Sequence, residues 1–77
     1  MTHSDHLDRN DHPANLILIE QSGAKREIPQ PSATDGIIEA EQAMQNHGGR
    51  LREVKVVSRH QAIARWKVSE LGWRRVA

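Results

Sequence analysis

The sequence predicts a small α+β domain, in which a mostly antiparallel sheet carries one helix on one of its faces. Residues 32–47 repeat their apolar side chains with the period of a helix. On either side of this segment, apolar residues occur in short runs or alternate with polar ones, as is typical of strands. Turn-forming residues separate these stretches. Strands grouped around one helix are typical of an antiparallel sheet with that helix on one face. The expected order is β-β-α-β-β, with a short final strand.

The 77 residues are expected to form one domain, residues 16–77, after a disordered polar tail, residues 1–15. The tail has one large apolar residue, Leu7, so burial cannot offset the entropy lost on ordering. The absence of Cys excludes disulfides and thiolate zinc sites. No apolar run reaches the length of a signal-peptide core or a membrane span. We therefore expect a cytoplasmic protein.

A first β-hairpin is expected before the helix. Its strands are residues 16–19 and 25–28, and Gly23 supplies the positive φ that the turn between them requires. Pro29 and Pro31 lack an N–H donor and restrict the residues before them. They are expected to end the second strand and to form a stiff link into the helix.

The helix is predicted over Ser32–His47. Its apolar side consists of Ala33, Ile37, Ala40, Met44 and His47, and its polar side of Asp35, Glu39, Gln42 and Asn46. Ser32 or Thr34 is expected to cap the first turn, and Gly48 to close the last turn in the left-handed conformation. A helix this short is marginal alone in water, so it must pack on the sheet.

A second β-hairpin is expected after the helix, because residues 51–58 and 61–68 both alternate in polarity. Arg59-His60 is the expected turn, although this pair lacks the Gly or Asn that favours a two-residue primed turn. A longer loop is therefore kept as an alternative. Residues 69–72 are expected to form a further turn, with Leu71 packing inward, before a final strand over residues 73–76.

The phase of these strands predicts which residues lie beneath the helix. The residues expected to face it are Val54, Val56, Ala62, Ala64, Trp66 and Val68, and those expected on the other side of the first strand are Leu51, Glu53, Lys55 and Val57. The two alanines allow a close approach of the helix, and Trp66 supplies the largest apolar area of the core.

The opposite face of the sheet is then expected to be basic and exposed to solvent. The net charge is −2 over residues 1–15, −3 over residues 16–49 and +6 over residues 50–77. The residues expected on this face are Ile63, Arg65, Lys67 and Lys55, with one of Arg74 and Arg75. An antiparallel sheet often keeps one face in water. A partner there would be acidic or phosphate-bearing, and a face that only confers solubility is the alternative.

No catalytic, cofactor or metal site is predicted. The three His and three Asp of residues 1–15 are ligand types for a divalent metal, but a disordered tail has no second shell to orient them. His47, in the last helical turn, is interpreted as a capping or packed residue. Ser58, Arg59 and His60 lack the orienting third group of a nucleophile-base arrangement, and no Gly-rich phosphate loop is present.

Aromatic platforms for nucleic acid are scarce. Phe and Tyr are absent, and Trp66 is assigned to the core. Trp73, if exposed beside Arg74 and Arg75, forms a cluster suited to base stacking or to anchoring a protein contact. Specific base readout is not expected, whereas affinity for phosphates stays open.

The order of elements resembles that of small proteins encoded by phages and other mobile elements. The stretches that carry the resemblance are Glu39–Ala43, Val54–Val57 and Ala62–Trp66. Such proteins include anti-CRISPR inhibitors, which bind Cas effector complexes and block target recognition or cleavage. The resemblance covers the architecture of residues 16–76 and assigns no functional residue. This chain lacks the dense acidic patch with which several such inhibitors imitate DNA.

We expect a small non-catalytic binding protein that occupies a surface of a larger macromolecule, in its most concrete form an anti-CRISPR-type inhibitor of a host nucleoprotein complex. The expected contact residues are Lys55, Arg65, Lys67, Trp73, Arg74 and Arg75. The alternative is a nucleic-acid-binding accessory protein that places the same face on phosphates, which would show steep salt dependence. A homodimer formed through a strand edge, or through Ile63 and Trp73, is compatible with both. Reversing Arg65 and Lys67 to Glu is expected to weaken binding with little change in thermal unfolding.

Overall fold

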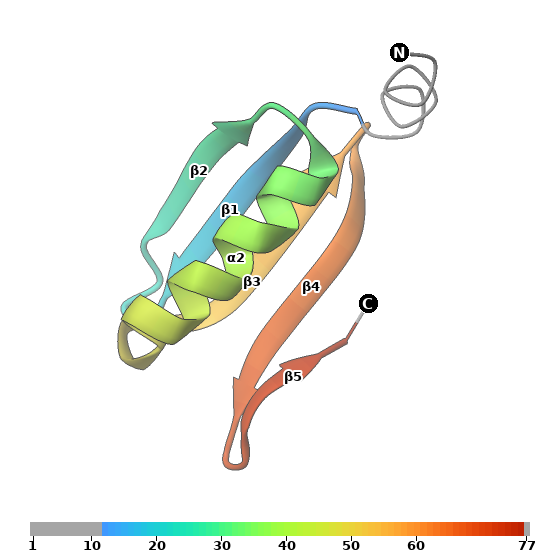
Figure 1. The fold of residues 1–77 in the computed structure, drawn as a ribbon. Helices are drawn as coiled ribbons and strands as arrows, with labels where there is room; N and C mark the ends of the chain where they lie inside the picture. Colours follow the sequence, from blue (N-terminus) through green and yellow to red (C-terminus); the bar gives the residue numbers. More distant parts are fainter. Residues whose placement is uncertain (1–11, 77) are drawn as a thin grey trace.

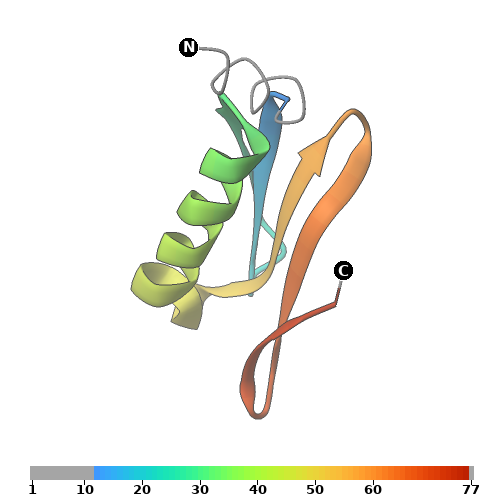
Figure 2. The same cartoon turned by 45° about the vertical axis from the view of Figure 1, so that its right-hand side comes forward.

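The computed structural model describes residues 12–76 as one antiparallel sheet with a helix on one face (Figures 1 and 2). The strands are β1 (Ala14–Glu20), β2 (Lys25–Gln30), β3 (Leu51–Ser58), β4 (Gln61–Ser69) and β5 (Gly72–Arg75), and the helix α2 (Ala33–His47) is followed by the 3-10 turn η1 (Gly48–Arg50). The five strands lie in the order β2-β1-β3-β4-β5. The predicted α+β class is confirmed. Within the described residues, no helix combines the length and the apolar composition needed to cross a membrane.

The first hairpin extends further at both ends than the sequence suggested. β1 begins at Ala14, a buried residue, so the last residues assigned to the polar tail belong to the sheet; residues 1–11 of that tail lie outside the described residues. The turn holds Gly23 at φ +95, as predicted. The expectation that Pro29 ends the second strand is wrong, because β2 continues to Gln30. β2 is an edge strand, where Pro is tolerated since one side of the strand has no partner.

The helix begins at the predicted cap and packs through its smallest residues. Ser32 Oγ accepts a hydrogen bond from the Asp35 N–H at 3.1 Å. Gly36 and Ala40 are buried against the sheet, whereas His47, predicted on the packed side, is exposed. A Cβ at Gly36 would lie 2.8 Å from Val56 Cγ1. Hence Gly36 on the helix, as well as Ala64 on the sheet, allows the helix and the sheet to approach closely.

Gly48 does not close the helix in the left-handed conformation, so that prediction is wrong. Its φ of −56 and ψ of −31 are right-handed, and the chain continues into η1. A Cβ at this position would lie 2.9 Å from Nε1 of Trp73. Gly48 is therefore placed where the ring of Trp73 packs against the backbone.

Two β-bulges change the faces that simple alternation assigned. The pairing of β1 with β3 shifts so that Leu51 opposes Glu20, and Leu51 is buried at 1% exposure although it was predicted on the open side. The pairing of β3 with β4 shifts so that Ala62 opposes Val57. Because Val57 follows the buried Val56, both Val57 and Ala62 lie on the side away from the helix, and Ala62 is exposed.

Arg59 and His60 form a two-residue turn between β3 and β4, so the longer loop is not needed. Both residues have positive φ, 53 and 65 respectively. This is the backbone of a primed turn, which Gly and Asn adopt at least cost. The sheet therefore holds two L-residues in a conformation that they rarely adopt.

Replacing Arg59-His60 by Asn-Gly is expected to stabilise the domain by about 1 kcal/mol, because it removes this backbone cost. A gain of that size raises Tm by about 4–8 °C in a domain of this length, measured by thermal unfolding in circular dichroism. Arg59→Lys is the control, since it loses the 3.4 Å contact with His12 Nδ1 and keeps the backbone conformation. Equal Tm values for the Asn-Gly variant and the wild type would contradict the prediction.

The core lies between α2 and the central strands β1, β3 and β4. Its buried residues are Ala14, Leu16, Leu18, Ala40, Leu51, Val54, Val56, Ala64 and Trp66. The predicted phase of β4 is confirmed by Ala64 and Trp66, which are 0% and 7% exposed. The prediction that Leu71 packs inward is wrong, because this side chain is fully exposed at the turn between β4 and β5. That hairpin extends past the C-terminal end of the helix (Figure 2).

Candidate functional site

The sheet face away from the helix, named here the open face, carries most of the predicted contact residues. Lys55 on β3 opposes Arg65 on β4, and Lys67 on β4 opposes Arg74 on β5. Opposed residues share one face of an antiparallel sheet. These four basic side chains therefore occupy three adjacent strands on the same side of the molecule, and Arg74, not Arg75, is the C-terminal arginine of this face.

β1 and β2 complete the open face with residues that the sequence reasoning missed. Ile17 opposes both Glu27 and Lys55, and Ile19 opposes both Lys25 and Glu53. The signal in the sequence is the alternation within residues 25–28, which predicts a strand and also places Lys25 and Glu27 on one of its sides. The open face is thus a mixed surface. Its basic residues are Lys25, Lys55, Arg65, Lys67 and Arg74, its acidic residues Glu27 and Glu53, and its apolar residues Ile17, Ile19, Val57 and Ala62, of which Ile17 is buried.

Glu53 organises the centre of this face. Its carboxylate accepts a hydrogen bond from Arg65 Nε at 2.6 Å, and the Glu53 side chain is only 14% exposed. Because removing one partner of such a pair leaves the other charge poorly solvated, reversing Arg65 to Glu would also disturb the fold. Lys55 and Lys67 are therefore better probes of binding than Arg65.

Trp73 and Arg75, also predicted contact residues, lie on the helix side of the sheet. Trp73 opposes Val68, and Arg75 opposes the buried Trp66. The Arg75 guanidinium stands over the Trp66 ring, 5.4 Å from its centroid. The predicted cluster of Trp73, Arg74 and Arg75 is thus divided between two faces, and neither tryptophan lies on the open face.

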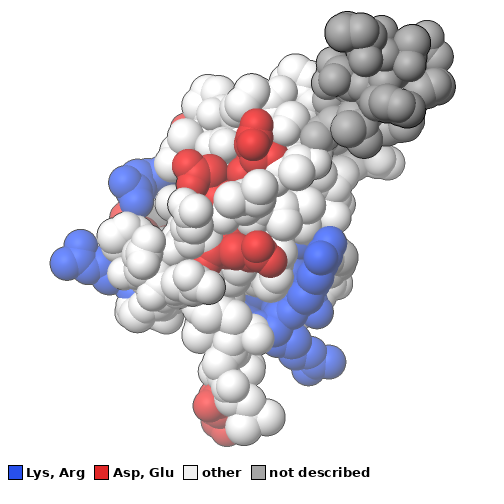
Figure 3. Space-filling view, in the orientation of Figure 1, with Lys and Arg blue, Asp and Glu red and all other residues white. Residues whose placement is uncertain are grey.

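The charges of the two faces differ in sign. The acidic residues of α2, which are Asp35, Glu39 and Glu41, are all exposed. Figure 3 shows acidic side chains over the helix and basic side chains at both flanks of this view. The charge difference along the sequence is therefore also a difference across the molecule, with an acidic helix and a basic open face.

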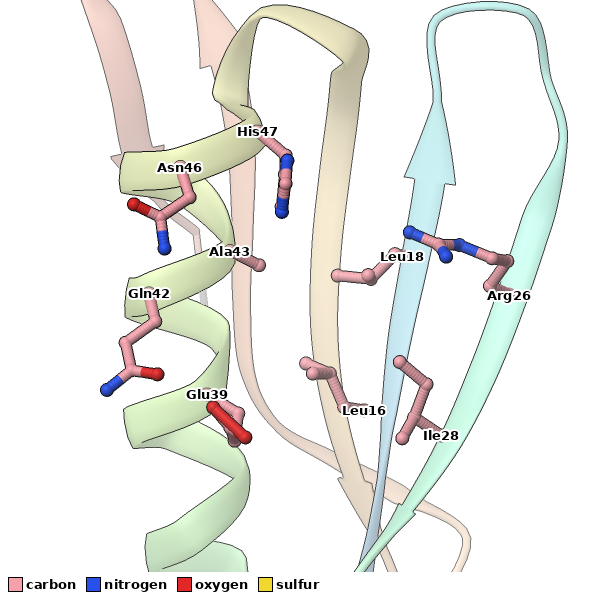
Figure 4. A pocket seen from close by; sticks show the side chains of 9 residues that line it. All are labelled: Leu16, Leu18, Arg26, Ile28, Glu39, Gln42, Ala43, Asn46 and His47. Atoms are coloured by element: carbon pink, nitrogen blue, oxygen red, sulfur yellow. The ribbon is translucent and has the colours of Figure 1, made fainter.

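Two of the grooves beside the helix have apolar linings. The first, named the β2 groove, has a volume of about 240 Å³ and lies between α2 and the strands β1 and β2. In Figure 4 its apolar floor comes from Leu16, Leu18 and Ile28, with Ala43 on the helix and the polar Arg26 and His47 at its edge. The second, named the tryptophan groove, has a volume of about 430 Å³ and is lined by Glu41, Met44, Gln45, Trp66, Trp73 and Arg75.

Three serine hydroxyls among residues 12–76 are engaged in local structure. Ser32 Oγ caps the helix, Ser58 Oγ donates to the Pro13 carbonyl at 3.0 Å, and Ser69 Oγ donates to the Gly72 carbonyl at 2.9 Å. Over residues 12–76, no three His, Cys, Asp or Glu residues come close enough to hold a metal ion. The described surfaces carry charged groups and exposed apolar area.

A scan against protein-family models, a search of curated proteins and a search of solved structures find no match for this chain.

Proposed function

We propose that this protein is a small non-catalytic binding protein that occupies a surface of a larger acidic protein or nucleoprotein in the cytoplasm, using the open face of its sheet. The observation that carries the proposal is the convergence of Lys55, Arg65, Lys67 and Arg74 on three adjacent strands, on the side of the sheet opposite α2. Arg is enriched at protein interfaces.

The composition of the open face favours a protein surface over bare nucleic acid. Glu27 and Glu53 place two carboxylates among the cations, and Arg65 is bound to one of them. A face that binds a phosphate backbone gains affinity from cations without carboxylates among them, and from aromatic side chains that stack on bases. Both tryptophans lie on the other side of the sheet. Ala62, which is exposed and lies on the open face opposite Val57, offers apolar contact instead.

The most concrete form of the proposal is an anti-CRISPR-type inhibitor, and the architectural resemblance supports it. In this form the open face would cover an acidic protein surface of a Cas effector complex and block target recognition or cleavage. Imitation of DNA is not part of the proposal, because the exposed acidic residues of the helix are few.

The double variant Lys55→Glu with Lys67→Glu is expected to lose binding and inhibition by about tenfold or more, since reversing interfacial charges costs several kcal/mol. The measurement is target-DNA cleavage by purified Cas effector complexes, together with calorimetric titration of the complexes. The matched control is Arg26→Glu with Arg50→Glu, which makes the same charge change on exposed residues of β2 and η1.

Equal loss of binding in both double variants would show a general charge effect and would contradict the assignment of the contact to the open face.

A nucleic-acid-binding function is tested with a short duplex and a single-stranded oligonucleotide by fluorescence anisotropy. Phosphate binding would weaken steeply between about 50 and 200 mM salt. If such binding occurs and is lost in the double variant Lys55→Glu with Lys67→Glu, it would favour the alternative of a nucleic-acid-binding accessory protein.

A further inference from the structure

β2 forms one edge of the sheet, and among residues 12–76 no strand lies on its outer side. Five of its six residues are exposed. An edge strand presents unpaired N–H and C=O groups, to which an extended segment of another chain can add as a further strand. The hydrogen-bond phase of β2 determines which of its residues offer these groups.

Lys25 and Glu27 point both of their backbone groups outward. The hairpin that joins β1 to β2 closes with a hydrogen bond of 2.8 Å from the Glu20 N–H to the Ala24 carbonyl. Bonded and non-bonded pairs alternate from there along an antiparallel ladder, so Lys25 and Glu27 are in pairs that do not bond to β1. Pro29 has the same phase, and its missing N–H therefore leaves the ladder intact. An added strand can bond fully to Lys25 and Glu27 and can donate to the Pro29 carbonyl.

The β2 groove lies beside this edge, on the helix side of the sheet. α2 packs mainly on β1 and β3, so the helix side of β2 is largely uncovered. Ile28 is 38% exposed there, and Leu16 opposite it and Ala43 on the helix continue the apolar surface inward. A side chain that an added strand places opposite Ile28 lies on the same face. An apolar residue at that position would cover Ile28 and reach into the groove.

A further hollow, of about 400 Å³, continues the β2 groove past the end of β2, and it is acidic. Its lining residues are Gln30, Pro31, Asp35, Ile38, Glu39 and Gln42, of which Glu39 and Gln42 also line the β2 groove. Asp35 accepts a hydrogen bond from Ser32 Oγ at 3.1 Å. The Glu39 carboxylate is in no ion pair among the described residues. This end of the groove therefore favours a cation.

The other end of the β2 groove already holds a cation. Arg26 lies there, and its Nε is 3.9 Å from the Glu20 carboxylate. Figure 4 shows Arg26 level with Leu18, and Glu39 level with Ile28. A cation of an added strand is thus repelled at the Arg26 end and attracted at the acidic end. Neighbouring residues on one face of a strand are two positions, or about 6.6 Å, apart. Hence a cation at the acidic end and an apolar residue opposite Ile28 are separated by one residue.

We propose that β2 and the β2 groove bind an extended segment of another protein with the pattern cation-x-apolar, which adds antiparallel to β2. The cation lies opposite Gln30, beside Asp35 and Glu39, and the apolar residue lies opposite Ile28. Antiparallel addition lets one residue exchange both bonds with Glu27. It also sets the order of the pattern, because the added segment runs from the Gln30 end of β2 toward its first residue. The basic residues of the open face lie on the other side of the sheet, so this inference does not depend on the proposed function.

The test is a titration of the full, isotope-labelled chain with the peptide acetyl-Thr-Lys-Thr-Leu-Thr-Val-Thr-amide, followed by NMR. In the proposed register its Lys lies opposite Gln30 and its Leu opposite Ile28. The amide signals of Lys25 and Glu27 are expected to shift and to saturate, with a Kd of about 1 mM or lower. A peptide with Glu in place of Lys is expected to bind about threefold more weakly or worse, because it places a carboxylate beside Asp35 and Glu39.

Two methylated peptides test the strand addition itself and leave the protein unchanged. The N–H of the Thr that follows Leu faces Glu27 in the proposed register, so an N-methyl group there is expected to lower the affinity about tenfold. The Leu N–H faces away from β2. An N-methyl group on Leu is therefore the matched control and should change the affinity little. Equal effects of the two methyl groups would overturn the proposal.

Two protein variants test the acidic end. Glu39→Gln is expected to weaken binding of the Lys peptide about two- to fivefold, the loss of one exposed ion pair. Glu41→Gln makes the same change on the other flank of α2, beside the tryptophan groove, and should not weaken it. Equal binding of the Lys and Glu peptides, or no saturable shift of Lys25 and Glu27 at several millimolar peptide, would overturn the proposal. Shifts of these amides with protein concentration alone would also overturn it, because the occupant would then be a second copy of this chain.

Discussion

Trp66→Ala is expected to unfold the domain or to leave it only marginally folded. Removing a buried Trp costs about 3–5 kcal/mol, and a single core in a chain of this size rarely supplies more than about 3–5 kcal/mol in total. Trp66 is 7% exposed and lies within the core cluster. Urea unfolding followed by far-UV circular dichroism measures the loss.

Two control variants accompany Trp66→Ala. Leu71→Ala removes a large apolar side chain that is fully exposed, so the urea midpoint should stay at the wild-type value. Trp66→Phe keeps an aromatic ring in the core and should retain the fold at a smaller cost. If Trp66→Ala and Leu71→Ala gave the same midpoint, the assignment of Trp66 to the core would be wrong.

Gly36→Leu is expected to destabilise the domain by about 3 kcal/mol, and Gly36→Ala by about 1–2 kcal/mol, both from overpacking. The clash opposes the gain of about 1 kcal/mol that Ala brings to a helix interior. The neighbour that a Cβ would meet at 2.8 Å is Cγ1 of Val56. Val56 is 0% exposed and is paired with strands on both sides, so it has little room to move.

A double-mutant cycle isolates this contact. Val56→Ala removes Cγ1, so Gly36→Ala should cost less in that background than in the wild type, with a coupling of about 1 kcal/mol. Gly49→Ala is the matched control, because nothing lies within 4 Å of a Cβ there. Equal costs for Gly36→Ala in both backgrounds would show that Val56 is not the obstacle.

Local patterns predicted the elements of this fold because each pattern has a direct physical cause. The helix and its Ser32 cap follow from apolar spacing and side-chain chemistry. The phase of β4 follows from the alternation of Trp66 with Arg65 and Lys67, since exposure to water costs free energy only for the apolar Trp66 ring. This phase places Arg65 and Lys67 on the open face, and the alternation of Lys55 with the buried Val54 and Val56 places Lys55 there.

The features that local patterns did not predict depend on long-range packing and on strand register. Gly48 was assigned a left-handed conformation because that is the common role of Gly after a helix, but Trp73 packs against it. Leu71 was assigned to the core on hydrophobicity alone, although a two-residue turn leaves no surface for it to cover. The division of Arg74 from Arg75 needed the register of β5 on β4, and no local signal gives that register.

The position of β1 between β2 and β3 determines the order in which the chain can fold. Three of the four strand pairings join consecutive strands, whereas the pairing of β1 with β3 encloses β2 and α2 within residues 21–50. Closing this long loop costs entropy before any contact across it is gained. We therefore expect the β1–β2 hairpin and the β3–β4–β5 meander to form early and separately, and their association to be the slow step. Until that step the helix has no complete surface to pack on, because its floor is shared between β1 and β3.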